Sequence, residues 1–156
     1  MKLRNQPLDV AIDLYAVLQR HLSTISTRRL WCPVRRVHLS PSPEEMVRIA
    51  CIYFLMDEKG IHPKRIAVEK AIASRIKNKR GRYDLLVYDR HGKPQLLIEC
   101  KAPKVILTSQ HLIQLLVYNA DVKAPYLWLT NGHTNYFIHV EVESNTAHFI
   151  EQFPPL

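Results

Sequence analysis

The residues best suited to chemistry in this chain are two acids and a lysine, Asp84, Glu99 and Lys101. Asp84 lies in one apolar run, Glu99 and Lys101 lie in the next, and a Gly/Pro turn signal separates the runs, so we expect a β-hairpin. Because side chains alternate along a strand, Glu99 and Lys101 should share a face. Charged groups in an apolar strand are costly to bury without a partner. A divalent cation held by both carboxylates would be such a partner.

Two carboxylates and a lysine suit the hydrolysis of a phosphodiester. Mg²⁺ takes one or two carboxylates together with waters and substrate phosphate oxygens, and it lowers the pKa of a bound water. We therefore expect Asp84 and Glu99 to bind Mg²⁺, with Mn²⁺ as a substitute. Lys101 would stabilise the transition state or orient the attacking water, and its pKa should be depressed if the ammonium group is partly desolvated.

A further carboxylate is expected from Glu44 or Glu45, at the start of a helix predicted from residue 43 to about residue 59. Ser42, the proline after it and Glu45 together match an N-cap, a first-turn proline and a capping box. Glu45 therefore has two interpretations, a third metal ligand or a capping residue, and the sequence leaves both open.

A polar stripe follows on the second predicted helix, which should begin at residue 108 or 109 and end near residue 119. Gln110, Gln114 and Tyr118 recur there at four-residue spacing and so share one face. The stripe would contact a DNA backbone or the catalytic lysine, or simply face the solvent.

The net charge favours a polyanionic partner. Lysine and arginine number 22 against 14 acidic residues, which gives a charge of +8 and a pI near 9.6. Nucleic acid is the first candidate, although such a charge also serves solubility alone. Lys77, Lys79, Arg80 and Arg82 cluster just before Asp84, where they would hold DNA phosphates beside the metal.

Length and composition limit the class of protein. The 156 residues, 47% hydrophobic, suit one globular domain, and no apolar stretch is long enough to span a membrane. The three cysteines lack CxxC spacing, so neither a disulfide framework nor a zinc site is indicated. The eight histidines show no metal-binding spacing and are interpreted as surface or loop residues. We expect a cytoplasmic protein.

The elements that must position the candidate residues follow the order helix, three strands, helix, two strands. An additional first helix is predicted over residues 8–22, in an N-terminal extension (residues 1–34) packed on a domain formed by residues 35–156. The predicted strands cover residues 66–72, 83–88, 95–101, 126–130 and 136–142. Asn131 and Gly132 predict a tight turn between the last two strands.

Six segments, in this order, resemble the N-terminal nuclease domain of type I restriction enzyme R subunits, a family of the PD-(D/E)XK nuclease superfamily. The segments are residues 42–48, 66–70, 83–88, 98–103, 114–119 and 129–132. The resemblance implies an α/β fold with a restriction-endonuclease-like αβββαβ core, in which helices flank a mixed central sheet. It also implies Mg²⁺-dependent cleavage of DNA.

The resemblance assigns roles to individual residues. The matching positions are Asp84 and Glu99 for the metal-binding acids, Lys101 for the catalytic lysine, Gln114 and Tyr118 for a Gln-x-x-x-Tyr motif, Glu44 or preferably Glu45 for a first-helix acid, and Glu69 for a strand acid that would support the site from outside.

The chain departs from R subunits in lacking a GxxxxGK[ST] phosphate loop, so we expect it not to translocate DNA by itself. A restriction-system or helicase partner would then choose the target, and a homodimer would supply the two active sites needed to cut a duplex. The leading hypothesis is a DNA endonuclease, stand-alone or a subunit of a restriction-type defence system. The alternatives are a non-cleaving DNA-binding module on the same fold, or a protein-interaction scaffold.

Overall fold

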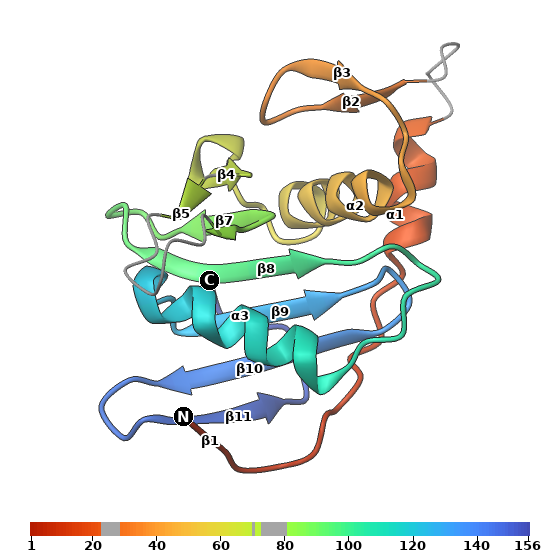
Figure 1. Ribbon diagram of the computed structural model, residues 1–156. Coiled ribbons are helices and arrows are strands. Elements are labelled where there is room, and N and C mark those ends of the chain that lie inside the picture. The colour runs from red at the N-terminus through yellow and green to blue at the C-terminus, as the bar shows by residue number, and fades with distance from the viewer. Residues whose placement is uncertain (23–28, 70, 73–80) are drawn as a thin grey trace.

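A seven-stranded mixed sheet forms the centre of the protein (Figure 1). The computed structural model describes residues 1–22, 29–69, 71–72 and 81–156. In spatial order the strands are β1 (Lys2–Leu3), β11 (Thr146–Ile150), β10 (Asn135–Glu141), β9 (Tyr126–Thr130), β8 (Pro94–Cys100), β7 (Leu85–Tyr88) and β4 (Ile66–Val68). β8 is parallel to β9 and β1 is parallel to β11, whereas all the other neighbours are antiparallel.

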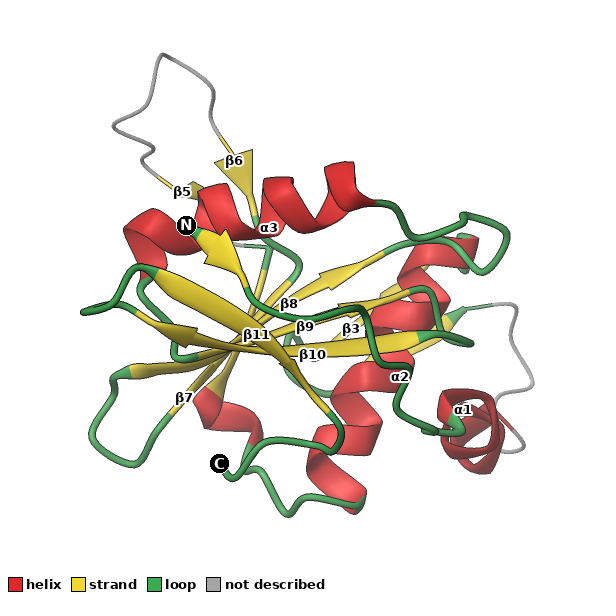
Figure 2. Ribbon diagram, turned by 90° about the horizontal axis from the view of Figure 1, so that it is seen from below, coloured by secondary structure: helices red, strands yellow, loops and turns green. Residues whose placement is uncertain are grey.

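Helices cover both faces of the sheet (Figure 2). α1 (Leu14–Leu22) and α2 (Pro43–Asp57) lie on one face, and α3 (Ser109–Val122) lies on the other. Side chains of β8 alternate between these two layers: Leu96 and Ile98 pack with α2, and Leu97 packs with α3. None of the helices in the described residues is long and apolar enough to cross a membrane.

Short elements complete the fold. A hairpin of β2 (Leu30–Cys32) and β3 (Val37–Leu39) lies beside α2, and β5 (Ala71–Ile72) pairs with β6 (Gly81–Arg82). A 3₁₀ turn, Pro63–Arg65, precedes β4.

The first long helix has the predicted start. The Ser42 hydroxyl accepts a hydrogen bond from the Glu45 N–H (3.1 Å), and Pro43 occupies the first turn. Every residue from Val47 to Leu55 is buried, Arg48 included, as expected for a helix that is apolar on most sides. Gly60, with φ +64°, follows the end of the helix and lets the chain turn back.

The predicted hairpin is formed by β7 and β8, with Leu85 opposite Ile98 and Leu86 opposite Leu97. α3 then connects β8 to the parallel strand β9. From α2 onward the elements follow the order α2, β4, β5, β6, β7, β8, α3, β9, so the fold is mixed α/β, with strands before and after α3.

The structure corrects the bounds of two predicted elements and adds a strand. α1 begins at Leu14, not at residue 8, because Asp13 caps it by accepting from the Ala16 N–H (2.9 Å) and Asp9 instead bonds the Asn135 N–H (2.8 Å). The strand predicted over residues 66–72 ends at Val68, because Glu69 adopts φ +45°. β11 was not predicted, and it pairs with β10 along its whole length.

The N-terminal residues contact the rest of the chain on one face of the sheet and at one of its edges. Leu14 and Leu18 of α1 share the apolar cluster of α2, and β1 pairs with β11. A domain boundary between residues 34 and 35 stays a prediction.

Candidate active site

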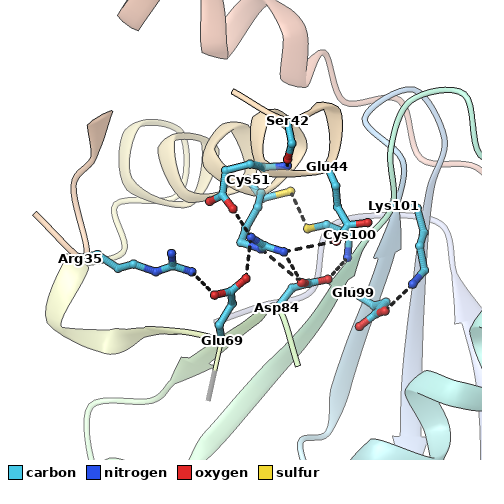
Figure 3. Close-up of polar contacts among 11 residues, drawn as sticks. Arg35, Ser42, Glu44, Cys51, Glu69, Asp84, Glu99, Cys100 and Lys101 are labelled. Carbon is cyan, nitrogen blue, oxygen red and sulfur yellow. Dashed lines mark hydrogen bonds and ion pairs between the residues drawn. The ribbon is translucent and has the colours of Figure 1, made fainter. Parts of the chain in front are cut away.

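Asp84 stands directly before β7, next to the C-terminal end of β8, and both of its carboxylate oxygens accept hydrogen bonds (Figure 3). Oδ1 accepts from Arg48 Nη2 (2.7 Å) and Nε (3.2 Å). Oδ2 accepts from the Cys100 N–H (2.6 Å). Because Asp84 is 8% exposed, these charge-assisted bonds lie in a weakly screened environment and fix the orientation of the carboxylate.

Arg48 is the cation around which this cluster is built. Its guanidinium, on the buried part of α2, forms ion pairs with four carboxylates: Asp84 (2.7 Å), Glu45, Glu69 (3.0 Å) and Glu44 (3.4 Å). Burial alone would lower the pKa of Arg48, but the charge and hydrogen bond of Asp84 and the charge of Glu45 outweigh burial and raise the pKa above its ordinary value. Arg48 is therefore a permanent positive charge.

Sequence reasoning gave Arg48 no role. Two signals pointed to it: it is the only charged residue within the apolar run from Met46 to Met56, and it stands three and four positions after Glu45 and Glu44. That spacing places all three side chains on one helix face.

Glu99 and Lys101 form a second ion pair at the end of β8. Lys101 Nζ lies 2.7 Å from Glu99 Oε1. Glu99 is 4% exposed, and its Oε2 is buried without a partner among the described residues. Burial, and then the nearby charge of Asp84, raise the pKa of Glu99 to about 7. Glu99 is thus a partly protonated acid with a free acceptor oxygen.

The expected depression of the lysine pKa is wrong. Burial does lower the pKa of Lys101, but the hydrogen bond and charge of Glu99, with a further contribution from Asp84, outweigh it. The pKa of Lys101 lies above its ordinary value, because the acids stabilise the ammonium form more than desolvation destabilises it.

Cys100 separates the two charged residues and points into the opposite layer. Its Sγ lies 4.0 Å from Cys51 Sγ of α2, in the apolar cluster. Complete burial raises the pKa of the Cys100 thiol, which makes it unreactive.

Glu45 performs one half of the capping box and also joins the ion cluster. Its N–H bonds Ser42 Oγ, while its carboxylate pairs with Arg48. The Ser42 N–H donates to the Ser40 carbonyl (2.9 Å), so the side chain of Glu45 is not its partner. Glu45 Oε1 is buried without a partner among the described residues, and burial raises the pKa of Glu45 against the charge of Arg48.

Glu69 supports Arg48 and Asp84 together. Its carboxylate pairs with Arg48 and with Arg35 (2.8 Å), and its N–H donates to the Asp84 carbonyl (2.9 Å). A φ of +45° is costly for a residue with a Cβ. The bonds on both sides of Glu69 hold it in that conformation.

Gln114 and Tyr118 lie half-buried on one face of α3 and bond each other, with Gln114 Nε2 donating to Tyr118 Oη (2.8 Å). Gln110 is exposed. α3 packs over β8 and β9, on the face to which alternation assigns Glu99 and Lys101. No polar contact recorded for the described residues joins the Gln114–Tyr118 pair to Glu99 or Lys101.

Of the predicted basic cluster, only Arg82 can be placed. It is exposed on β6, two residues before Asp84. Lys77, Lys79 and Arg80 lie outside the described residues.

The donor set fits a divalent cation between Asp84 and Glu99. Glu99 Oε2, which has no partner among the described residues, is a hard oxygen donor. After burial, the charge of Asp84 is the next cause of the raised pKa of Glu99, and a cation would relieve the repulsion between the two carboxylates. Among the described residues, no three acidic groups at this site have ligand atoms that all lie within 4.8 Å of one another. Two protein carboxylates with water and substrate oxygens are typical of Mg²⁺.

Comparison with protein families gives a match over most of the chain. A family model described as "Type I restriction enzyme R protein N terminus (HSDR_N)" matches residues 43–154. The matched region begins at the first residue of α2 and includes Arg48, Asp84, Glu99 and Lys101. A comparison with curated proteins finds no match.

Proposed function

Because the chain belongs to the family of type I restriction enzyme R protein N-terminal domains, we propose that it is a metal-dependent DNA endonuclease that hydrolyses phosphodiester bonds. The observation that carries the proposal is the side chain of Glu99. One of its oxygens binds Lys101, and the other has no partner among the described residues. Burial, and then the nearby charge of Asp84, raise the pKa of Glu99 to about 7. Such a pair of acids with a lysine suits phosphoryl chemistry on a cation.

Asp84 and Glu99 would hold the Mg²⁺ ion. Bound there, Mg²⁺ would polarise the scissile phosphate and lower the pKa of a bound water. Glu99 binds a cation in its ionised form, so binding releases the proton that this residue partly retains near pH 7.

Lys101 acts as a fixed positive charge. Its raised pKa keeps it protonated at neutral pH, so it is not the general base. The ammonium group, held at the end of β8 by Glu99, is suited to donate a hydrogen bond to a phosphate oxygen as negative charge develops.

Arg48 positions Asp84 rather than touching substrate. Its two bonds to Oδ1, with the Cys100 N–H on Oδ2, determine where that carboxylate points. Glu45 acts in the same way, through Arg48. Positioning of this kind lowers the reorganisation needed for catalysis.

The positive charge of the chain supports DNA as the substrate. A net charge of +8 attracts phosphates, and Arg82 is exposed close to Asp84 in the sequence. A partner protein from a restriction system would supply the choice of target, in a cytoplasmic setting, and two copies would cut the two strands.

A second candidate is a DNA-binding module that does not cleave. It is favoured by the contacts of Asp84, because Arg48 and the Cys100 N–H already donate hydrogen bonds to its two oxygens. In this candidate the acids are structural partners of Arg48 and bind no cation.

Incubation of the purified protein with supercoiled, linear and single-stranded DNA distinguishes the endonuclease from the non-cleaving module. We expect cleavage with Mg²⁺ or Mn²⁺, none with EDTA, and none with Lys101→Ala or Glu99→Gln. Lys104→Ala is the matched control, because Lys104 is an exposed lysine in the loop just after the site, and it should retain cleavage.

The other outcomes are equally informative. DNA binding that weakens with salt, without cleavage under any metal condition, would favour the non-cleaving module. Neither binding nor cleavage would favour the scaffold. Circular dichroism of each variant establishes that a loss of cleavage is not a loss of folding.

A further inference from the structure

Two histidines and a glutamate come together on β10 and β11, away from the candidate active site. His139 and His148 are directly opposite each other across the antiparallel pair, with ring centroids 5.1 Å apart. Glu141 lies two residues beyond His139 on the same face, and its Oε1 is 3.9 Å from His148 Nδ1. Each residue offers one ligand atom, and all three atoms lie within 4.8 Å of one another.

The cluster lies on the opposite face of the sheet from Glu99. Ile138, Val140 and Phe149, the neighbours in β10 and β11, pack in the α3 layer, so the three cluster residues face the other way. They are also at the other end of β9: His139 pairs with Tyr126, whereas Cys100 pairs with Thr130. The side chains of His148 and Glu141 are 33% and 37% exposed, so an ion can reach them.

The carboxylate of Glu141 is oriented by two hydroxyl groups. Its Oε2 accepts from Ser144 Oγ (2.8 Å) and from Thr146 Oγ1 (3.2 Å). Those two bonds lower the pKa of Glu141, so the group is an anion at neutral pH. With Oε2 bonded in this way, Oε1 is left on the side of His148. Supporting bonds of this kind are what orient carboxylate ligands in metal sites.

We propose that His139, Glu141 and His148 form a binding site for Zn²⁺, separate from the proposed Mg²⁺ site and independent of DNA cleavage. Imidazole nitrogens suit Zn²⁺, whereas Mg²⁺ prefers oxygen ligands. Two histidines and one glutamate fill three positions of a tetrahedral ion and leave the fourth to water. Because the ligands come from both β10 and β11, the ion would fasten this hairpin and stabilise the folded state.

Sequence reasoning interpreted the histidines as surface or loop residues because they lack metal-binding spacing. His139 and His148 are nine positions apart, and only the antiparallel register of β10 and β11 makes them neighbours. β11, which carries His148, was not among the strands predicted from the sequence.

The test uses full-length protein without a histidine tag, stripped with chelator and then dialysed. Isothermal titration with Zn²⁺ in a large excess of Mg²⁺ should give one ion per chain. Thermal unfolding with Zn²⁺ present should show a higher melting temperature than without it. Co²⁺ should bind with the visible absorption of a tetrahedral site. His148→Ala and the near-isosteric Glu141→Gln should each weaken Zn²⁺ binding at least about tenfold and abolish the thermal shift.

Two control variants make the result specific. His91→Ala removes an exposed histidine from the turn between β7 and β8, and Glu99→Gln alters the proposed Mg²⁺ site. Both should bind Zn²⁺ as the wild type does. The proposal is overturned if the wild type binds no Zn²⁺, if Mg²⁺ displaces it, or if both cluster variants bind it normally. None of these results depends on whether the protein cleaves DNA.

Discussion

Four acids share one buried guanidinium at the candidate active site. Arg48 contacts carboxylates from α2, from the end of β4 and from the residue before β7. Because repulsion among buried carboxylates is strong where screening is weak, a cation must be present in the folded chain. Arg48 provides that charge whether or not a metal is bound.

Replacement of Arg48 should therefore be severe. We expect Arg48→Met to lower the free energy of unfolding by about 3–5 kcal/mol, because Asp84 and Glu45 would lose the buried cation with which they pair. Urea denaturation measures the loss. Arg20→Met is the matched control: Arg20 pairs with Glu58 at 2.5 Å, but the side chains are 54% and 43% exposed, so its loss should cost far less stability than the loss of Arg48. Equal effects of the two variants would contradict the role given to Arg48.

The raised pKa of Glu99 predicts a pH-dependent stability. Between about pH 4.5 and 7 the unfolded chain releases the Glu99 proton while the folded chain retains it, so the folded state loses stability as the pH rises through that window. Fully developed, the loss is about 3 kcal/mol.

Glu99→Gln should remove this dependence, because glutamine stays neutral at every pH. Its free energy of unfolding, measured in urea with EDTA present, should be flatter than that of the wild type between pH 4.5 and 7, and higher at pH 7. Glu143→Gln, at an exposed glutamate, is the control and should leave the wild-type slope unchanged. If the free energy of unfolding of Glu99→Gln kept the wild-type slope with pH, the dependence would arise from another group.

Spacing along one strand was enough to find part of the site. Glu99 and Lys101 had to share a face because they are two residues apart in an apolar run, and the turn before them indicated a hairpin that brings Asp84 alongside. The partner of Asp84 was not predictable in this way, because the contact with Arg48 joins positions 36 residues apart and depends on how α2 packs.

At the scale of elements, α2 is positioned by a close approach to the turn between β9 and β10. Gly132 in this turn has φ +90°, and a Cβ there would lie 3.3 Å from Val47 Cγ2 on α2. Asn131 supports the turn from within: its Oδ1 accepts from the His133 and Thr134 N–H groups, and its Nδ2 donates to the Val105 carbonyl. The turn thus links α2 to the loop that follows Lys101.

Gly132→Ala should destabilise the protein by about 1–3 kcal/mol, since alanine is strained at this φ and its methyl group would press on Val47. Thermal or urea unfolding measures the change. Gly92→Ala is a matched control, because Gly92 also has a positive φ (+79°) but nothing lies within 4 Å of its missing Cβ. We expect the Gly132 variant to lose more than the Gly92 variant, and the reverse order would show that α2 adapts freely at Val47.

Element boundaries were predictable where a side chain with a known cap or turn preference stands at the boundary. Ser42 and Pro43 marked the start of α2, and Asn131 and Gly132 marked the turn after β9. The end of β4 was missed because Glu69 carries a positive φ, a conformation that glutamate rarely adopts. Contacts with Arg35, Arg48 and Asp84 impose it, and those contacts are tertiary.

For the whole molecule, the charge of +8 predicts DNA binding that weakens as salt rises. Fluorescence anisotropy with a labelled duplex should give a linear fall of log K with log salt. Arg82→Gln should lower affinity and reduce the slope by about 1 if Arg82 contacts a phosphate. Arg90→Gln is the control, because Arg90 is an exposed arginine in the turn at the other end of the β7–β8 hairpin. Equal losses in the two variants would show that affinity follows net charge and not this surface.

The order of the long elements could be predicted for the whole molecule, but β11 and β1, at one edge of the sheet, could not. Each core element carried its own pattern, such as the apolar runs of β8 and β9. β1 is only two residues long, and pairing of so short a segment depends on the strand beside it.

That short strand also covers part of an edge of the sheet. The backbone of β1 occupies part of the free edge of β11, with the N–H groups of Lys2 and Arg4 donating to the carbonyls of Asn145 and Ala147 (3.1 and 3.0 Å). An uncovered edge strand is a template on which a second chain can add a strand. The two exposed residues of β1, Lys2 and Leu3, therefore reduce the length of edge strand on which another chain could pair. Removal of residues 1–4 would expose β11 to edge-to-edge self-association.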